Sequence, residues 1–349
     1  MSTIESKAVI FKAIPTGQPT TETIVVEKTA VEFAAPEGGL LVQVLYVSLD
    51  PYLRGKMRDP SIKSYTPAYN IGETLSNFGV CRVVDSGVEA YKKGDLIRSP
   101  IVPFSEYAAV SKTALPYYQK IDNVHNFPLT YFIGILGMPG LTAFYSFYEI
   151  GQPKKGETIY ISAAAGAVGM TVGQLAKAEG LRVVGSAGSD DKVKFLKEEL
   201  GFDEAWNYKK EPLNEAMSKY MPEGIDIYFE NVGGEMLDAV LAHANTYGRI
   251  IACGMISQYS LTPEKAYGVK NLMSVVAKRL KIQGFVILDQ LQNDPNLAKT
   301  FYEKVSDLLA SKKMTFKDDV YDGIEETPEA FIGLLTGKNF GKVSVKFAE

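Results

Sequence analysis

The sequence of 349 residues is poor in the side chains that bind metals and form crosslinks. It contains two cysteines, Cys81 and Cys253, and two histidines, His125 and His243. Two cysteines allow one disulfide at most, so a disulfide framework is excluded and a reduced, cytoplasmic setting is expected. The same count excludes a four-cysteine structural zinc site. The two histidines are interpreted as a loop residue and a helix-surface residue.

An excess of positive charge is also missing. The 37 Lys and Arg residues are outnumbered by 41 Asp and Glu residues, which gives a net charge of -4. This balance leaves no electrostatic footprint for nucleic acid or for an anionic membrane. Residues 1–11 lack the long apolar segment of a secretory signal. The uncharged stretch 131–148 has the length of a membrane span, but the glycines and the proline in its middle favour a buried helix–turn–helix passage.

The first third of the chain is dominated by β-branched or alternating apolar runs that are separated by turn residues. These runs predict a barrel-like or sandwich domain. The expected strands are 8–12, 23–26, 40–45, 79–85, 96–100 and 105–110.

From about residue 150 the pattern changes to strands that alternate with helices. The expected strands are 158–163, 182–186, 204–207, 225–230, 249–253 and 281–286, with helices at 167–179, 190–200, 213–220 and 235–244 between them. Six strands with interleaved helices predict an α/β fold built on a doubly wound parallel sheet. A further helix is expected at 300–311. The alternation at 340–347 predicts a last strand that returns to the first domain.

One segment of this second part, residues 159–177, joins an apolar run to a helix through a turn of small residues. Ala164 takes the first position of the pattern Gly-x-Gly-x-x-Gly, and Gly166 and Gly169 take the other two. Gly169 and Gly173 lie four residues apart on one helix face, where a missing side chain permits close packing on the sheet. Strand, tight turn and helix N-terminus together predict a site for a dinucleotide pyrophosphate. An ordinary glycine-rich strand–helix turn is the alternative.

The tip of the second strand in this region indicates which dinucleotide binds. NAD-binding sheets place a carboxylate there for the ribose 2′-OH, whereas residues 185–189 contain no acid. Small hydroxyl and backbone donors at this tip favour the 2′-phosphate of NADP, with Lys192 as the cation and Tyr208 as a hydroxyl donor. Asp190 and Asp191 argue for NAD unless they are first-turn acids that face water. NADP is therefore the prediction.

Further motifs follow one another along the chain in a fixed order. They are SLDPYLRGKM at 48–57, GMPGLTA at 137–143, VGSAGS at 184–189, NYK at 207–209, ENVGG at 230–234, CGMISQY at 253–259, QGF at 283–285 and GKNFGK at 337–342. Together with the glycine turn they resemble the zinc-independent medium-chain dehydrogenase/reductases. Within these, the chain is similar to the NADPH-dependent alkenal/one double-bond reductases, relatives of the prostaglandin reductases of the leukotriene B4 12-hydroxydehydrogenase type.

The resemblance covers nearly the whole chain and implies its domain organisation. It implies a Rossmann NADP-binding domain at residues 131–301. The β-rich, GroES-like substrate domain would comprise residues 1–130 and 302–349. NADPH is expected in the cleft between these domains.

The resemblance also implies which residues contact NADPH. Gly166, Ala167 and Val168 would lie at the pyrophosphate. Gly188, Lys192 and Tyr208 would hold the 2′-phosphate end. The remaining implied contacts are Met138, Thr142, Asn231, Cys253, Tyr259, Phe285, Val286, Ile287, Asn339 and Gly341.

A catalytic zinc site is not expected. Zinc enzymes of the superfamily carry a histidine just before the glutamate that corresponds to Glu73, and this chain has Asn70 and Ile71 there. Without a Lewis acid to stabilise an alkoxide, alcohol oxidation is not favoured.

Hydride transfer to an electron-poor carbon is the remaining chemistry. In an α,β-unsaturated aldehyde or ketone the β carbon accepts hydride, and the carbonyl oxygen then needs a preplaced donor. Tyr259, after the fifth strand of the parallel sheet, is the candidate donor, and Tyr52 is the candidate on the other side of the substrate. Both tyrosines have packing roles as the alternative, because the chain contains 20 of them.

The sequence is also compatible with two other functions. One is an NADPH:quinone reductase of the same superfamily, and the other is an NADPH-binding protein without turnover. Residues 58–70 and 260–271 are expected to shape the substrate pocket. The family resemblance implies a homodimer, with the strand at 281–286 as the candidate edge.

Overall fold

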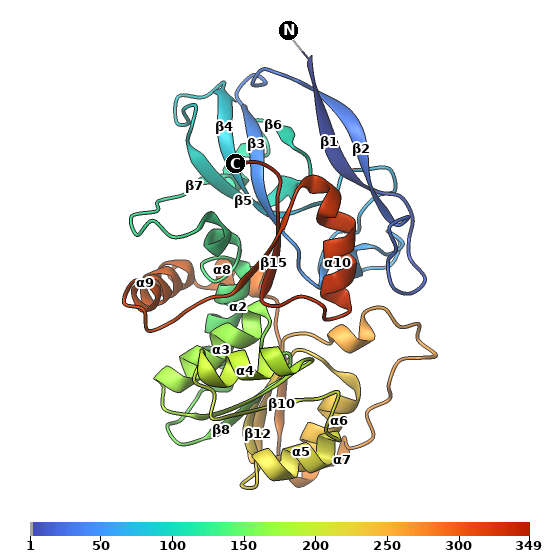
Figure 1. Cartoon of the computed structure of the whole chain (residues 1–349), viewed down its shortest axis with the longest axis vertical. Helices are drawn as coiled ribbons and strands as arrows, with labels where there is room; N and C mark the ends of the chain where they lie inside the picture. Colours follow the sequence, from blue (N-terminus) through green and yellow to red (C-terminus); the bar gives the residue numbers. More distant parts are fainter. Residues whose placement is uncertain (1–2) are drawn as a thin grey trace. The chain divides into compact units, whose positions relative to one another are not determined.

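The computed structural model describes residues 3–349, which form two compact units (Figure 1). The first unit runs to Gly137 and also includes Asp318–Glu349, and the second unit is Met138–Lys317. The expected boundary at residue 302 differs, since it would divide helix α9 (Leu297–Ala310). The whole of α9 belongs to the second unit, where the ring of Phe301 packs edge-on against Phe144 with centroids 5.7 Å apart.

The second unit contains the predicted six-stranded parallel sheet. Its strand order is β10-β9-β8-β11-β12-β13. The strands are β8 (Thr158–Ile161), β9 (Arg182–Ala187), β10 (Glu204–Asn207), β11 (Ile225–Glu230), β12 (Ala244–Ala252) and β13 (Lys281–Gly284). The chain winds outward from β8 to β10, crosses back to β11 and continues to β13. The prediction of a doubly wound α/β fold is confirmed.

Helices connect these strands at the expected places. They are α3 (Ala167–Ala178), α4 (Asp190–Glu198), α5 (Leu213–Tyr220) and α6 (Gly234–His243), and Figure 1 shows helices on both sides of the sheet. Three buried rings stack over the strands: Trp206 lies 5.0 Å from Tyr160, which lies 5.2 Å from Tyr228. Such large apolar surfaces dominate the packing energy of a core.

The first unit contains the predicted β-rich domain. Strands β1 (Thr3–Phe11) and β2 (Ile24–Glu32) form an antiparallel pair, and a seven-stranded sheet has the order β14-β15-β3-β4-β5-β7 with β6 beside β3. The members of the larger sheet are β3 (Leu40–Ser48), β4 (Ser76–Ser86), β5 (Leu96–Pro103), β6 (Tyr107–Val110), β7 (Gln119–Lys120), β14 (Asp318–Asp322) and β15 (Lys342–Lys346).

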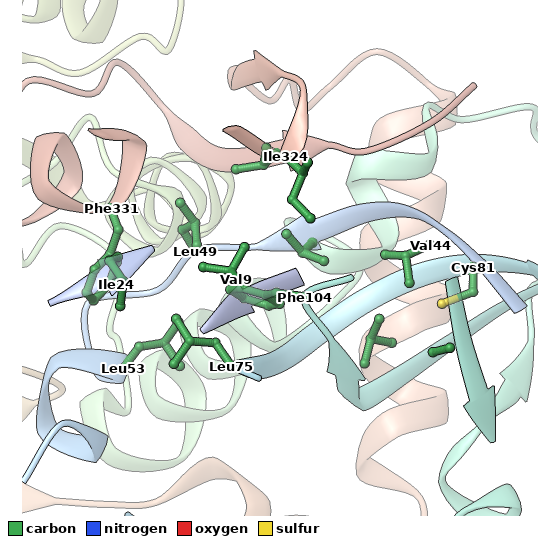
Figure 2. Packing of buried hydrophobic residues seen from close by; sticks show 14 of the residues in the cluster. Val9, Ile24, Val44, Leu49, Leu53, Leu75, Cys81, Phe104, Ile324 and Phe331 are labelled. Carbon is green, nitrogen blue, oxygen red and sulfur yellow. The ribbon is translucent and has the colours of Figure 1, made fainter. Parts of the chain in front are cut away.

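The last strand does return to the first domain, as the sequence predicts. Strand β15 is antiparallel to β3, with Ser344 opposite Ser48. Strand β14 and helix α10 (Thr327–Leu335) precede it and were not expected from the sequence. Helix α10 supplies Phe331 to the core, which Figure 2 shows beside Ile24 and Leu49. The C-terminal segment is therefore part of the hydrophobic core of the first unit.

The uncharged stretch 131–148 is not one continuous helix. It is divided among a 3₁₀ turn (Leu129–Ile133), helix α2 (Met138–Tyr145) and a π-helical turn (Ser146–Gly151), in agreement with the predicted interrupted passage. Among residues 3–349, no helix combines the length and the apolar character needed to cross a membrane.

Candidate functional site

The predicted strand, tight turn and helix N-terminus, which we call the cradle, are present where β8 leads into α3. Gly166 is the N-cap residue, with φ −82° and ψ 169°, and its position has no side-chain cap. Ala163 adopts a left-handed conformation with φ 48°, which turns the chain sharply between β8 and α3. The first N–H groups of a helix have no partner within the helix, so those of Ala167 and Val168 are oriented to meet an anion. This arrangement fits a pyrophosphate.

The two glycines of the α3 motif differ in what surrounds them, and this difference gives a test. A Cβ on Gly169 would lie 2.7 Å from the carbonyl oxygen of Ala163 and 2.8 Å from Cα of Ala164, whereas a Cβ on Gly166 would meet only the Ala163 oxygen at 3.3 Å. We predict that Gly169→Ala destabilises the protein by about 1–3 kcal/mol through overpacking against backbone.

Gly166→Ala is the matched control for stability. We expect it to keep the unfolding temperature of the wild type and to weaken NADPH binding about tenfold, as one charge-assisted hydrogen bond is perturbed. Thermal unfolding and fluorescence titration measure the two effects. Equal NADPH affinity of Gly166→Ala and wild type would place the pyrophosphate elsewhere.

Gly188 and Tyr208, two of the residues predicted for the 2′-phosphate, lie beside each other beyond β9 and β10. A Cβ on Gly188 would lie 3.3 Å from the hydroxyl oxygen of Tyr208 and 3.4 Å from Cε of Lys209. The backbone N–H of Lys192 donates to Oγ of Ser189, the N-cap of α4, so Lys192 sits in the first turn of that helix. Lys209 was missed by the sequence reasoning, although its place beside Tyr208 in the NYK motif could have indicated it.

Asp190 is a first-turn acid of α4 whose side chain is 64% exposed, so the interpretation that it faces water is confirmed. Its Oδ1 accepts a hydrogen bond from Asn207 at 2.9 Å, and its Oδ2 pairs with Lys210 at 2.5 Å. Hydrogen bonds from Asn207 and Lys210 lower the pKa of Asp190. The exposed carboxylate is therefore engaged by Asn207 at the end of β10 and by Lys210 beyond it, which offsets part of its repulsion of a phosphate.

We predict that Lys192→Ala weakens NADPH binding about 10- to 100-fold, since a hydrogen bond to a charged group contributes about 1.5–3 kcal/mol. NADH affinity should change by less than about twofold, because NADH lacks the 2′-phosphate that the cation would meet. Lys194→Ala is the control on the same helix, where Lys194 pairs with Glu198 across one turn. Equal weakening of both dinucleotides would remove Lys192 from the phosphate site.

The point where the winding of the sheet reverses lies between β8 and β11, and two residues join the strand ends there. The backbone N–H of Asn231 donates to Oγ of Ser162 at 3.0 Å, and its side-chain amide donates to the Ser162 carbonyl at 2.8 Å. Open α/β sheets bind ligands in the crevice at such a reversal. Asn231 is thereby fixed at the carboxyl edge of the sheet that carries the cradle.

Glu230, which the sequence reasoning did not select, organises this edge. Its Oε1 accepts hydrogen bonds from the Tyr228 hydroxyl at 2.8 Å and from the N–H groups of Val232 and Gly233 at 2.6 and 2.8 Å. Its Oε2 is buried and has no partner within residues 3–349. Burial raises the pKa of Glu230 despite these donors. The carboxylate holds the start of α6 and hence the loop that contains Asn231.

Cys253 and Tyr259 belong to the segment after β12. The N–H of Cys253 donates to the Glu230 carbonyl at 3.1 Å. A 3₁₀ turn (Ile256–Gln258) leads to Tyr259, whose hydroxyl oxygen accepts the N–H of Met255 at 3.1 Å. A Cβ on Gly254 would lie 2.8 Å from that oxygen, so the glycine leaves space for the hydroxyl. The sheet edge thus presents a tyrosine hydroxyl in a position fixed by backbone.

The remaining predicted residues of the second unit fall into two places. The Thr142 hydroxyl contacts the Met138 sulfur at 3.4 Å within α2. Phe285 packs at 5.9 Å on the ring of Tyr145 at the end of α2, and it is followed by Val286 and by Ile287, the buried first residue of α8 (Ile287–Asn293). Helix α2 therefore lies against the end of β13.

Tyr52, Asn339 and Gly341 lie in the first unit. The side-chain amide of Asn339 donates to the Gly341 carbonyl at 2.9 Å. The hydroxyl of Tyr52 donates to Oδ1 of Asn77 at 2.5 Å. Burial raises the pKa of Tyr52. The Tyr52 hydroxyl proton is used in a hydrogen bond to Asn77. A structural role for Tyr52 is therefore an alternative to the predicted catalytic role.

Asn77 links Tyr52 to a buried ion pair. Its Nδ2 donates to Oδ2 of Asp50 at 2.8 Å, and Nζ of Lys342 lies 3.4 Å from Oδ1 of the same carboxylate. The Lys342 amine also donates to the carbonyls of Leu49 at 2.7 Å and of Val343 at 2.6 Å. Residues of the SLDPYLRGKM and GKNFGK motifs, far apart in the sequence, are thus joined in the interior of the first unit.

Comparison with known proteins identifies the family. A family model described as zinc-binding dehydrogenase matches residues 167–310, and one described as the N-terminal domain of oxidoreductase matches residues 7–116. An NADP-dependent oxidoreductase of Cochliobolus heterostrophus is 44% identical over 99% of this chain and 98% of its own length. The chain belongs to the medium-chain dehydrogenase/reductases. Its place within them is among the zinc-independent, NADPH-dependent alkenal reductases.

Two further comparisons place this medium-chain reductase more narrowly. An NADP-dependent 2-alkenal reductase of Nicotiana tabacum is 43% identical over 97% of this chain and 96% of its own. The crystal structure of CurA from Vibrio vulnificus in complex with NADPH is 36% identical, superposes with a TM-score of 0.89, and is matched over 98% of this chain and 99% of that one. The full length of the reductase is therefore similar to these proteins.

The description of one family model mentions zinc. The Asp, Glu, Cys and His side chains of this medium-chain reductase are the ones that could bind it. In the part of the chain from residue 3 onward, no three of them are grouped as metal ligands. The carboxylate of Glu73 accepts a hydrogen bond from Asn70 at 3.0 Å. Asn70, one of the two residues that stand where zinc enzymes carry a histidine, is thus bonded to the glutamate itself.

Proposed function

We propose that this chain catalyses the NADPH-dependent reduction of the C=C bond of α,β-unsaturated aldehydes and ketones. The observation that carries the proposal is the Tyr259 hydroxyl, held by the Met255 N–H at the same sheet edge as the α3 cradle. The similarity to the tobacco 2-alkenal reductase supports the same substrate class.

In this proposal the N–H groups at the start of α3 bind the pyrophosphate, and Lys192 with Tyr208 binds the 2′-phosphate. Bound NADPH supplies the hydride for the β carbon of the substrate. Tyr259 donates a hydrogen bond to the carbonyl oxygen, where negative charge develops as the enolate forms. The α carbon then takes up a proton, which gives the saturated aldehyde or ketone.

A screen of NADPH oxidation across four acceptor classes tests the proposal: 2-alkenals, enones, quinones and simple ketones. We expect oxidation with alkenals and enones and none with simple ketones. Turnover of quinones alone would support the quinone reductase alternative. Stoichiometric NADPH binding without oxidation by any acceptor would support a binding protein.

We further propose that the chain forms a homodimer through β13, the outermost strand of the parallel sheet. An unpaired strand edge is a template for pairing with another chain, and Ile282 on this edge is 40% exposed. The two unpaired cysteines fit a reduced compartment, in line with the expected cytoplasmic location. Analytical ultracentrifugation of wild type and Ile282→Lys tests the dimer, since a charged side chain on a strand edge opposes pairing with another chain.

A further inference from the structure

Lys56, at the end of the short helix α1 (Leu53–Lys56), takes no part in the proposed reaction. The helix is held on one side by Leu53 and Met57, each 1% exposed, and Figure 2 shows Leu53 in the core of the first unit beside Leu75. Lys56 follows Tyr52 by four residues and is partly exposed. Its side chain therefore stands outside the packed core but is anchored to it through the helix.

The amine of Lys56 faces an aromatic ring that is itself fixed. Nζ lies 4.2 Å from the centroid of the Tyr69 ring, and the Tyr69 N–H donates to the Lys56 carbonyl at 2.8 Å. The Tyr69 hydroxyl donates to the Ser76 carbonyl at 2.7 Å, and its ring contacts Phe11 at 6.0 Å. The amine thus has a defined place over a rigid apolar surface.

The charge near this amine is positive. Within the described residues, the ion pairs involve other lysines and Arg249, and none includes Lys56. The Arg58 guanidinium is held nearby, because it donates to the carbonyls of Gly55, Ile62 and Thr66 at 2.9, 2.8 and 2.5 Å. Burial and this fixed cation lower the pKa of Lys56 to about 8. The face of the Tyr69 ring stabilises the charged amine, but the pKa of Lys56 is still lowered.

A lysine with this pKa is a better nucleophile at neutral pH than an ordinary one. At pH 7.5 about one quarter of such amines are neutral, against roughly one in a thousand for an unperturbed lysine. A less basic amine is also intrinsically less nucleophilic, which cancels part of the gain in the neutral fraction. The net reaction rate is expected to be about tenfold higher than that of an unperturbed lysine.

The usual competitors for an electrophile, the thiols, are suppressed in this chain. Burial raises the pKa of Cys81, and burial together with the Glu230 carboxylate raises the pKa of Cys253 to about 12. The thiolate is the reactive form of cysteine, so neither side chain reacts readily. With both thiols suppressed, an amine of lowered pKa competes better for an electrophile than it would beside a reactive cysteine.

We propose that Lys56 is a covalent modification site for small α,β-unsaturated aldehydes. The nitrogen lone pair forms a bond to the β carbon, and the π electron pair of the C=C bond moves to the carbonyl as an enolate. The proton of the resulting ammonium group is then transferred to the α carbon. The product is a β-amino aldehyde on Nζ, formed by addition without a leaving group or an oxidant. The choice of aldehyde rests on the proposed function, but the addition itself requires no turnover.

The test uses the full chain without NADPH, treated with crotonaldehyde at pH 7.5, trapped with borohydride and analysed by peptide mass spectrometry. We expect Lys56 to be labelled about tenfold faster than Lys63, an exposed lysine in the same segment. Its labelling should rise from pH 6.5 and level off above pH 9. Lys56→Arg should lose this label and leave the labelling of Lys63 unchanged.

Labelling of Lys56 at or below the rate of Lys63 in the wild type would overturn the inference. The outcome is separable from that of the proposed function. Suppose that Lys56 is labelled rapidly but that none of the four acceptor classes supports NADPH oxidation. The proposed reductase activity would then be contradicted, and the modification site would be supported. Enone turnover together with slow labelling of Lys56 would support the reductase activity and contradict the modification site.

Discussion

Replacing Tyr259 by Phe is expected to lower kcat for enone reduction by about 100- to 1000-fold while the Kd for NADPH stays within about twofold. Removal of one preorganised donor to a developing oxyanion has an effect of this size, about 2.7–4 kcal/mol. The ring would remain over Gly254, and only the hydroxyl that accepts the Met255 N–H is lost. The effect should therefore appear in kcat and not in cofactor binding. Steady-state kinetics and fluorescence titration measure the two quantities.

Tyr220→Phe is the matched control for this experiment. Its hydroxyl donates to Oε1 of Glu211 at 2.9 Å, so it is a bonded tyrosine of the same unit that the proposed chemistry does not use. We expect its kcat to stay within about threefold of wild type, the scale of one lost neutral hydrogen bond. An unchanged kcat in Tyr259→Phe, or an equal loss in both variants, would remove Tyr259 from the mechanism.

Replacing Lys342 by Met is expected to have the largest effect on stability, a loss of about 3–5 kcal/mol. The Lys342 side chain is 2% exposed and pairs with Asp50, so its removal leaves an uncompensated carboxylate in the core. Burial lowers the pKa of Lys342, and the Asp50 carboxylate opposes this shift. The first unit should lose roughly 10 °C in its unfolding temperature. Differential scanning calorimetry resolves this transition.

The same strand provides the control. Lys346 pairs with Glu349, whose side chain is 93% exposed, and such surface pairs contribute about 0–1 kcal/mol. Lys346→Met should therefore unfold within about 3 °C of wild type. The double variant Lys342→Met with Asp50→Asn should recover part of the loss, because it removes both charges. If Lys342→Met unfolded like Lys346→Met, the buried pair would not hold the C-terminal strand.

The alternation of strands and helices in the second unit could be predicted because strands such as β8 and β9 contain short apolar runs closed by turn residues. Local patterns also located the cradle, since Gly166 and Gly169 are close in sequence. Strand β14 was missed because Asp318–Asp322 contains only two apolar residues between acids. Helix α10 could have been found from the proline in its first turn.

Partners that lie far apart in the sequence could not be predicted. The hydroxyl of Tyr52 meets Asn77, and Asp50 meets Lys342, only because β3, β4 and β15 are neighbours in one sheet. The exposure of Asp190 could be predicted, but its hydrogen-bond partner could not. That partner, Asn207, comes from the next strand, and no local pattern connects the two residues.

The central claim, hydride addition to the C=C bond, is tested most directly by following the hydrogen itself. NADPH deuterated at C4, prepared in both stereochemical forms, is incubated with the enzyme and trans-2-hexenal, and the product is analysed by NMR. One of the two forms should give hexanal with deuterium on its β carbon. Deuterium on the former carbonyl carbon, in an allylic alcohol, would contradict the account.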